Sequence, residues 1–265
     1  MTKDSKSKTE NRTIPVNDNM DRRTFLKRSA LAGMAGLAAS VAPVNILANT
    51  NMPEKQEQFP DLKFNSNGKF KILQLTDTHY VSGDPRSERA LKNVAEMLDT
   101  ERPDLVIHTG DVIFGKPAEA SLREILSLIA DRKIPFAVTL GNHDEEFGKN
   151  RREVFDIIRS IPCNINTPVK EIYGVSNDII TATDDTVKWV FYLFDSNRHS
   201  KLPGIKGYDY IHFDQIAWYR NHSQAFTKRN GGTPVPSLAF FHIPLPEYNY
   251  ATRLDTRRVM KGNFG

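Results

Sequence analysis

Six side chains in this sequence have the types and positions needed to bind metal ions and to move a proton. They are Asp, Asn and His residues placed where short apolar runs end: Asp77, His79, Asp111, Asn142, His143 and His242. Carboxylate and carbonyl oxygens bind hard divalent cations, while zinc, iron and manganese also accept imidazole nitrogen. Such a set at one edge of a fold predicts a transition-metal site.

Each of these residues alone has an ordinary structural explanation. An Asp at a strand end often caps the following helix, and a His there is commonly solvated or hydrogen-bonded to a backbone carbonyl. The repetition favours the metal site, because three successive strand and helix units deliver such polar clusters, at residues 76–79, 109–111 and 141–144.

The apolar spacing predicts the elements that position these clusters. Short apolar runs at residues 70–75, 105–107 and 136–140 predict buried strands. Between them, apolar residues at helical spacing predict two amphipathic helices, marked by Leu91, Val94, Ala95 and Leu98 and by Leu122, Ile125, Leu126 and Ile129. Strands alternating with helices favour an open α/β sheet, in which the strand carboxyl ends share one edge and bind ligands there.

The remaining chain mixes strand and helix patterns. We expect a helix near Val154, Ile157 and Ile158, strands at residues 189–194 and 238–241, a helix at 213–226 and β-like structure at 170–188. This mixture predicts that a first, parallel sheet packs on a second, mixed sheet.

The polar clusters together resemble the motifs of the calcineurin-like metallophosphoesterases. The matching residues are Asp77-x-His79, Gly110-Asp111, Gly141-Asn142-His143-Asp144 and an isolated His242 after a strand. Residues 73–80, 102–112, 207–219 and 240–248 are most similar to the purple-acid-phosphatase-like branch. The resemblance implies an α/β fold in which two mixed β-sheets pack as a sandwich flanked by helices.

The resemblance also implies a role for each residue of the site. Asp77 and His79 would bind a first metal ion, Asn142 and His242 a second, and Asp111 would bridge both, with each carboxylate oxygen taking one ion. The two ions, divalent or trivalent iron, manganese or zinc, would activate hydroxide for attack on a phosphomonoester. His143 would act as general acid, and Asp144 would either orient it or, as we slightly favour, begin the next helix.

The sequence departs from the family pattern at Phe114 and in the part that follows His242. Phe114 stands where purple acid phosphatases have the tyrosine that gives their colour, so we do not expect a purple iron(III) centre. Protein phosphatases have an Asp there that orients the catalytic His, and its absence leaves the partner of His143 open. The closing Gly-His-x-His motif is missing after His242. We expect the chain to be C-terminally incomplete rather than to draw its last ligands from elsewhere, and as it stands to bind metal weakly and turn over slowly.

Composition excludes several other classes of protein. The 265 residues include one cysteine, Cys163, which excludes an internal disulfide framework. Residues 1–50 carry eight Lys or Arg and four Asp or Glu, which accounts for the whole net charge of +4. The body is therefore neutral, and no nucleic-acid-binding surface is indicated.

The N-terminal segment resembles a twin-arginine export signal. Arg22 and Arg23 precede Phe25, and a short Gly- and Ala-rich apolar stretch follows at residues 30–42. We expect residues 1–48 to be this signal, 49–68 a linker and 69–265 the metallophosphoesterase domain. The expected partners are a phosphate ester and the twin-arginine export machinery, with no permanent membrane span and a periplasmic or extracellular location.

Other candidate residues have simpler interpretations. We expect His108 to be buried and hydrogen-bonded, and His199, His212 and His222 to lie on the surface, with His199 the best alternative ligand. Arg86 fits a substrate phosphate and an exposed loop equally well. An aromatic group favours core packing over nucleobase stacking: Tyr208, Tyr210, Trp218 and Tyr219.

Two alternative functions stay open at this point. The same two-metal site would serve a phosphodiesterase or nucleotidase, because loops decide substrate choice. The missing terminal histidines also suit a non-catalytic exported binding protein on a truncated phosphoesterase scaffold.

Overall fold

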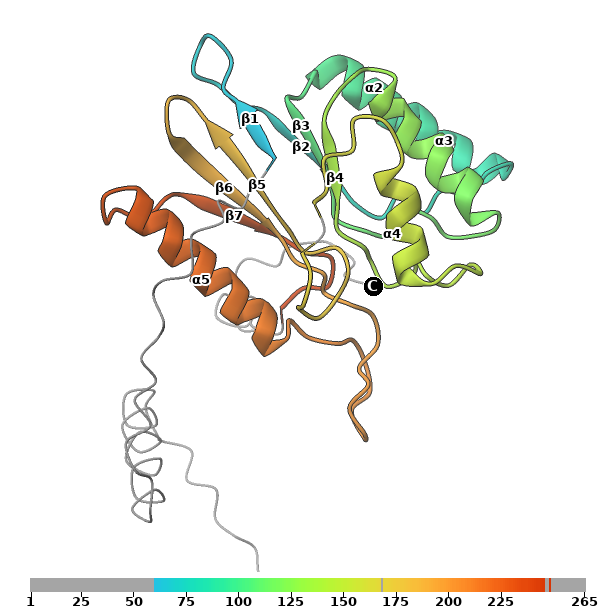
Figure 1. The fold of residues 1–265 in the computed structure, drawn as a ribbon. Coiled ribbons are helices and arrows are strands. Elements are labelled where there is room, and N and C mark those ends of the chain that lie inside the picture. Colours follow the sequence, from blue (N-terminus) through green and yellow to red (C-terminus); the bar gives the residue numbers. More distant parts are fainter. Residues whose placement is uncertain (1–59, 168, 246–247, 249–265) are drawn as a thin grey trace, which may run out of the picture. The chain divides into compact units, whose positions relative to one another are not determined.

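The computed structural model describes residues 60–167, 169–245 and 248, and these residues form two β-sheets (Figure 1). The first sheet is parallel, in the order β2 (Ile72–Leu75), β3 (Leu105–His108) and β4 (Phe136–Val138). The second is mixed, in the order β1 (Asp61–Lys63), β5 (Asp178–Thr183), β6 (Val187–Leu193) and β7 (Ser237–Phe240). The expected α/β architecture with two sheets is confirmed.

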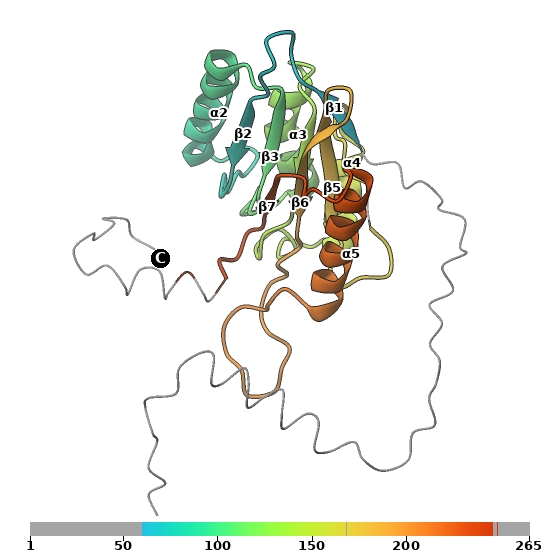
Figure 2. The ribbon, with the colours of Figure 1, turned by 90° about the vertical axis from the view of Figure 1, so that its left-hand side faces the viewer.

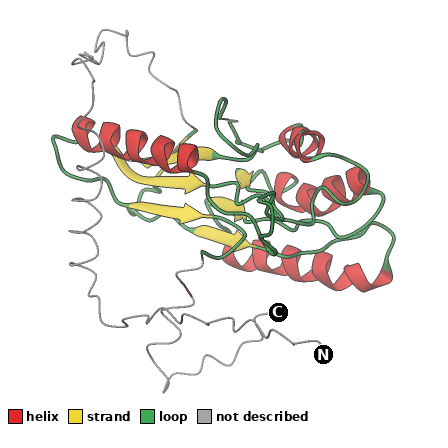
Figure 3. Cartoon of the chain, turned by 90° about the horizontal axis from the view of Figure 1, so that it is seen from below, coloured by secondary structure: helices red, strands yellow, loops and turns green. Residues whose placement is uncertain are grey.

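Helices flank both sheets. Three of them pack against the first sheet: α2 (Glu88–Glu101), α3 (Ala118–Ala130) and α4 (Arg151–Arg159). A single long helix, α5 (Phe213–Arg229), packs against the second sheet, and a short 3₁₀ turn at Pro85–Ser87 leads into α2. In Figures 2 and 3, α2 and α5 lie on opposite sides of the strands. Helices form where the apolar spacing predicted them.

Strand alternation divides the core into three layers. Leu105 and Ile107 of β3 point toward the second sheet, where they pack with Ile180 and Phe191, while Val106 points toward α2 and α3. Tyr192 of β6 packs on the other side of the second sheet, against α5. Because successive strand residues face opposite sides, each sheet contributes to two layers, and the two sheets form the expected sandwich.

One expectation about the N-terminal part needs correction. Residues 49–68 were expected to be a linker, but Asp61–Lys63 form β1, which pairs in parallel with β5. The Asp61 carboxylate accepts hydrogen bonds from the hydroxyls of Thr181 and Thr183, both 3.0 Å away. The polar sequence hid this strand because it lies at a sheet edge and buries little apolar surface. The expected signal at residues 1–48 lies outside the described residues, as do residues 249–265.

Among the described residues, no helix combines the length and apolar character that a bilayer crossing requires.

His108 occupies the end of β3 as a buried, neutral histidine, as expected. The backbone N–H of Gly110 donates to its Nδ1 at 3.2 Å, and its Nε2 lies 3.1 Å from the Thr78 hydroxyl, which itself donates to the Val112 carbonyl. Nδ1 must therefore accept a hydrogen bond while Nε2 carries the ring proton and donates. A second proton on Nδ1 would face the Gly110 N–H, so the imidazole stays neutral. Burial lowers the pKa of His108 from 6.5 to about 3.

We predict that His108 makes the fold acid-sensitive. Below about pH 6.5, His108 is protonated in the unfolded chain but stays neutral in the folded chain. The free energy of unfolding therefore falls as the pH falls, by roughly 3 kcal/mol at most between about pH 7 and about pH 4. His108→Asn keeps an acceptor for Gly110 and removes the titration. Urea unfolding across this range should give a shallower pH dependence for the variant, with His199→Asn, an exposed site, as control. Equal slopes would contradict this account.

Candidate metal centre

Three of the expected metal-binding residues have unusual backbone conformations. Asp77, His79 and Asp111 have φ angles of 50°, 47° and 51°, in the left-handed region that non-glycine residues seldom adopt. The two loops are joined by their backbones, since Asp77 N–H donates to Gly110 O at 3.0 Å and His79 N–H to Asp111 O at 3.1 Å. Strained residues of this kind cluster at functional sites, where the surrounding structure holds them in place.

The carboxylate of Asp111 lies at the centre of the cluster and is buried. Its Oδ2 lies 3.2 Å from His79 Nε2 and 3.3 Å from His242 Nε2. Its Oδ1 accepts the backbone N–H of His143 at 2.8 Å. Oδ2 therefore faces both imidazoles while Oδ1 is held by the backbone, and the bridging of two ions by Asp111 stays a prediction.

His242 comes from the segment after β7 and reaches across to the first sheet. Its Nδ1 donates to the carbonyl of Thr109 at 3.0 Å, which leaves Nε2 facing Asn142 Oδ1 at 3.1 Å and Asp111 Oδ2. Two oxygens that only accept therefore surround this nitrogen, which is the environment of a cation. Burial lowers the pKa of His242, but hydrogen bonding to Asp111 together with the negative charges of nearby carboxylates outweighs burial and raises the pKa overall.

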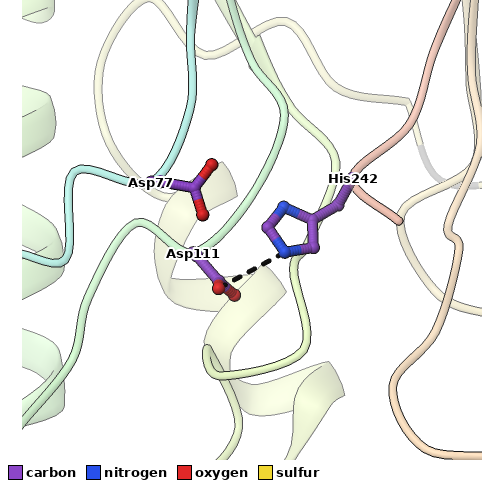
Figure 4. Close-up of side chains that lie close together, drawn as sticks. All are labelled: Asp77, Asp111 and His242. Atoms are coloured by element: carbon purple, nitrogen blue, oxygen red, sulfur yellow. Dashed lines mark ion pairs between the residues drawn. The ribbon is translucent and has the colours of Figure 1, made fainter. Parts of the chain in front are cut away.

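The ligand atoms fit a metal ion in number and chemistry. Single atoms of Asp77, Asp111 and His242 lie within 4.8 Å of one another, as Figure 4 shows for the three side chains. His79 Nε2 lies 3.8 Å from Asp77 Oδ1, and Asn142 reaches the cluster beside His242. The structure thus brings together all five residues expected to bind metal. Their oxygen and imidazole donors suit iron, manganese or zinc.

His143 lies at the rim of this cluster rather than within it. The centroid of its ring is 5.8 Å from that of His79 and 4.8 Å from that of Phe114, and both contacts are T-shaped. Its Nδ1 lies 2.8 Å from Glu146 Oε2. The sequence left the partner of His143 open, and the structure identifies it as Glu146.

Asp144 has a role that the sequence did not predict. It neither orients His143 nor begins a helix, because it is fully buried and accepts backbone N–H groups from two loops. The donors are Asp111 and Gly141 to Oδ2, at 3.0 and 2.8 Å, and Val112 and Ile113 to Oδ1, at 2.8 and 3.3 Å. Asp144 therefore fixes the Asp111 loop against the Gly141 loop.

Gly141 is required where these loops meet. A Cβ atom at this position would overlap the backbone nitrogen and the carboxylate of Asp111. The motif glycine thus allows the two metal-binding loops to approach each other, which is a packing constraint rather than a need for backbone flexibility.

A buried ion pair holds the Gly141 loop in place, and the sequence pattern did not predict this pair. Arg151, the first residue of α4, pairs with Asp195, which follows β6, and also donates to the carbonyls of Leu140 and Gly141. Burial raises the pKa of Asp195, but the Arg151 charge and the N–H groups of Val175 and Asn197 outweigh it and hold the pKa below its usual value. Arg151 and Asp195 therefore neutralise each other's charge inside the protein, where water does not reach them.

The other histidines have structural contacts of their own. His199 is exposed and stacks on Tyr208, as expected for a surface residue. The surface expectation was wrong for the other two, which are half-buried. His212 stacks between Tyr173 and Tyr210, and His222 donates to the carbonyl of Trp218.

The remaining residues singled out in the sequence also have defined contacts. Arg86 pairs with Asp84 on the surface, with 90% of its side chain exposed. The aromatic group divides, since Trp218 and Tyr219 pack in the core layer under α5 whereas Tyr208 and Tyr210 are exposed. Cys163 packs against the first core layer, with its thiol 3.9 Å from the Ala130 carbonyl.

The chain is similar to several known proteins. Residues 70–262 match the calcineurin-like phosphoesterase family. The chain is 31% identical to "Probable inactive purple acid phosphatase 29" of Arabidopsis thaliana, over 92% of this chain and 69% of the relative. It is 34% identical to "Phosphatase DCR2" of Saccharomyces cerevisiae, over 68% of this chain and 36% of the relative. Among solved structures, a dimetal phosphatase from Danio rerio gives a TM-score of 0.47 at 13% identity, covering 66% of this chain and 70% of that one.

The fold and the cluster define an α/β protein with a metal-binding edge. The chain belongs to the calcineurin-like phosphoesterase family, with similarity to purple acid phosphatases. Membership implies a hydrolase scaffold with two metal ions, whose identity the relatives do not determine.

We predict that Asp144→Asn weakens both the fold and metal binding. The amide would turn an NH₂ group toward two N–H donors, which costs roughly 2–4 kcal/mol of unfolding free energy. Loss of loop alignment should lower metal affinity about 10- to 100-fold. Urea unfolding and metal titration measure the two effects, with Asp156→Asn on the exposed face of α4 as control. Unchanged metal affinity in a folded Asp144→Asn protein would contradict the role assigned to Asp144.

Proposed function

We propose that this protein is an exported metal-dependent phosphoesterase that hydrolyses phosphomonoesters. The observation that carries the proposal is the position of Asp111 Oδ2, which lies 3.2 and 3.3 Å from the Nε2 atoms of His79 and His242. Imidazole nitrogens and carboxylate and amide oxygens, all of them potential metal ligands, lie side by side there. Once the imidazoles give up the protons that they share with Asp111, their Nε2 atoms can bind metal ions.

The five residues divide into two ligand groups around Asp111. Asp77 and His79 would hold one ion, and Asn142 and His242 the other. Two metal ions, when bound, would neutralise a phosphate group and lower the pKa of a water molecule. The chain's own contribution is to hold the ligands, with Asp111 Oδ1 fixed by the His143 amide and His242 fixed by the Thr109 carbonyl.

His143 would supply the proton that the departing alcohol needs. Its side chain is about one-third exposed at 31%, so a substrate can reach it. It lies next to Asn142 in the chain, yet its imidazole turns outward toward Phe114. A donor at the rim can face the leaving oxygen while the phosphate faces the metal ligands.

A second candidate is a non-catalytic binding protein on the same scaffold. The name of one relative, "Probable inactive purple acid phosphatase 29", favours it. A phosphodiesterase or nucleotidase would use the same ligands with a different substrate loop.

We predict that the purified protein hydrolyses p-nitrophenyl phosphate only with added Mn²⁺, Zn²⁺ or Fe²⁺, and that a chelator abolishes the activity. Asp111→Asn should lower kcat/KM by about 100-fold or more and should also lower the metal content. The reason is that the substitution removes the negative charge that both ions would share. Asp99→Asn, an exposed site paired with Arg132, is the control.

The same assay separates the alternatives. Hydrolysis of bis(p-nitrophenyl) phosphate in preference to the monoester would indicate a phosphodiesterase. Metal uptake without turnover of either ester would favour the binding protein and overturn the proposed activity.

Export is the second part of the proposal, supported by Arg22 and Arg23 before the apolar stretch at residues 30–42. The folded, metal-loaded protein would cross the membrane through the twin-arginine machinery to a periplasmic or extracellular location. We predict that changing both Arg22 and Arg23 to Lys retains the protein inside the cell, measured by fractionation and immunoblotting. Arg12→Lys in the same segment is the control. An identical distribution of the double variant and the wild type would contradict twin-arginine export.

A further inference from the structure

The imidazole of His143 is held by the carboxylate of Glu146, three residues further along the chain. Glu146 Oε2 lies 2.8 Å from His143 Nδ1, and the Glu146 backbone N–H donates to the His143 carbonyl at 3.0 Å. The two residues therefore close a short turn with their side chains side by side. Because an ionised carboxylate only accepts hydrogen bonds, Nδ1 carries a proton and Nε2 is the atom left for exchange with a substrate.

Glu146 is in turn held from a distant part of the chain. Arg198 Nη2 donates to Glu146 Oε1 at 3.1 Å, and Arg198 Nε lies 3.4 Å from Glu145 Oε1. Each carboxylate oxygen of Glu146 therefore has its own partner, His143 on one side and Arg198 on the other. The side chains are partly shielded, with 27% of Glu146 and 37% of Arg198 exposed.

The segment that carries Arg198 is itself anchored. The Arg198 carbonyl accepts the Asp209 N–H at 2.7 Å, and the N–H of the preceding Asn197 donates to Asp195 at 2.9 Å. Asp195 is the buried partner of Arg151. A guanidinium fixed in this way can set the direction of the Glu146 carboxylate.

Phe114 limits His143 on another side. The two rings lie 4.8 Å apart at an interplanar angle of 87°, and Phe114 also contacts Phe147 at 5.7 Å. A phenyl group offers no hydrogen bond to the imidazole, and among the described residues the hydrogen-bond partner of the His143 ring is Glu146.

We propose that Glu146, held by Arg198, is the positioning residue that directs His143 Nε2 toward the leaving group. The inference rests on the proposed function. As the bond between phosphorus and the ester oxygen breaks, its electron pair stays on that oxygen, which takes the Nε2 proton of the imidazolium. The oxygen of a hydroxide, formed from water that has released a proton to the solvent, forms the new bond to phosphorus. The imidazole is left neutral with its proton on Nδ1, facing Glu146, and takes up a proton from the solvent at Nε2 before the next turnover.

The test compares leaving groups that differ in their need for a proton. Glu146→Gln should lower kcat/KM for phenyl phosphate about 10- to 100-fold but that for 2,4-dinitrophenyl phosphate less than about threefold, since a good leaving group departs without an acid. Arg198→Gln should give the same pattern at about 3- to 10-fold for phenyl phosphate. The exposed pair Glu119 and Arg123 provides matched controls, Glu119→Gln and Arg123→Gln. An equal loss on both esters would mean a structural role and would overturn the inference.

A second measurement does not depend on turnover. Long-range ¹H–¹⁵N spectra of the zinc-loaded protein, at a pH where the imidazole is neutral, should show the His143 proton on Nδ1, with His143→Gln identifying the signals. Glu146→Gln should shift the proton toward Nε2 or mix the two forms, and an unchanged spectrum would overturn the inference. If the wild type hydrolyses no aryl phosphate, the proposed function fails, and these spectra alone decide whether Glu146 sets the His143 tautomer.

Discussion

The buried carboxylate of Asp111 is the constraint on which the rest of the site depends. It lies at the end of β3 in a left-handed backbone conformation, and its Oδ2 faces the imidazoles of His79 and His242. Burial raises the pKa of Asp111, but the hydrogen bonds from His242 and His79 outweigh it and lower the pKa. A negative charge held this way away from water must be compensated by its surroundings, and the loops around it place imidazole, amide and carboxylate groups that can do so directly or by holding metal ions.

Keeping these loops in place requires partners that are not ligands. Asp144 accepts N–H groups from the segments on either side of Asp111, and Gly141 allows those segments to touch. The Arg151 and Asp195 pair then holds the carbonyls of the Gly141 loop against the second sheet. Backbone strain at the metal-binding residues is thus opposed by hydrogen bonds to buried charged groups, which are stronger than bonds between neutral groups.

The residues at the rim of the site are held in place by a different kind of contact from those at its centre. The metal-binding residues come from strand ends and are fixed by backbone contacts, whereas His143 depends on side chains for its orientation. Phe114 offers no polar partner on one side of the His143 ring, and Glu146, which is paired with Arg198, supplies one on the other side.

The sequence by itself predicted the strands other than β1, the helices and the residues that meet at the carboxyl edge of the first sheet. It could do so because apolar periodicity reports burial, and parallel strands bring their carboxyl ends to one edge. Only the tertiary structure decided that β1 belongs to the second sheet, that one oxygen of Asp111 faces both imidazoles, and that Asp144, Arg151 and Glu146 act as supports. Those roles depend on side-chain direction and on contacts between residues far apart in the chain, such as His242 with Thr109 and Arg198 with Glu146. Such contacts leave no local pattern, because each partner is an ordinary polar residue until the fold brings the two together.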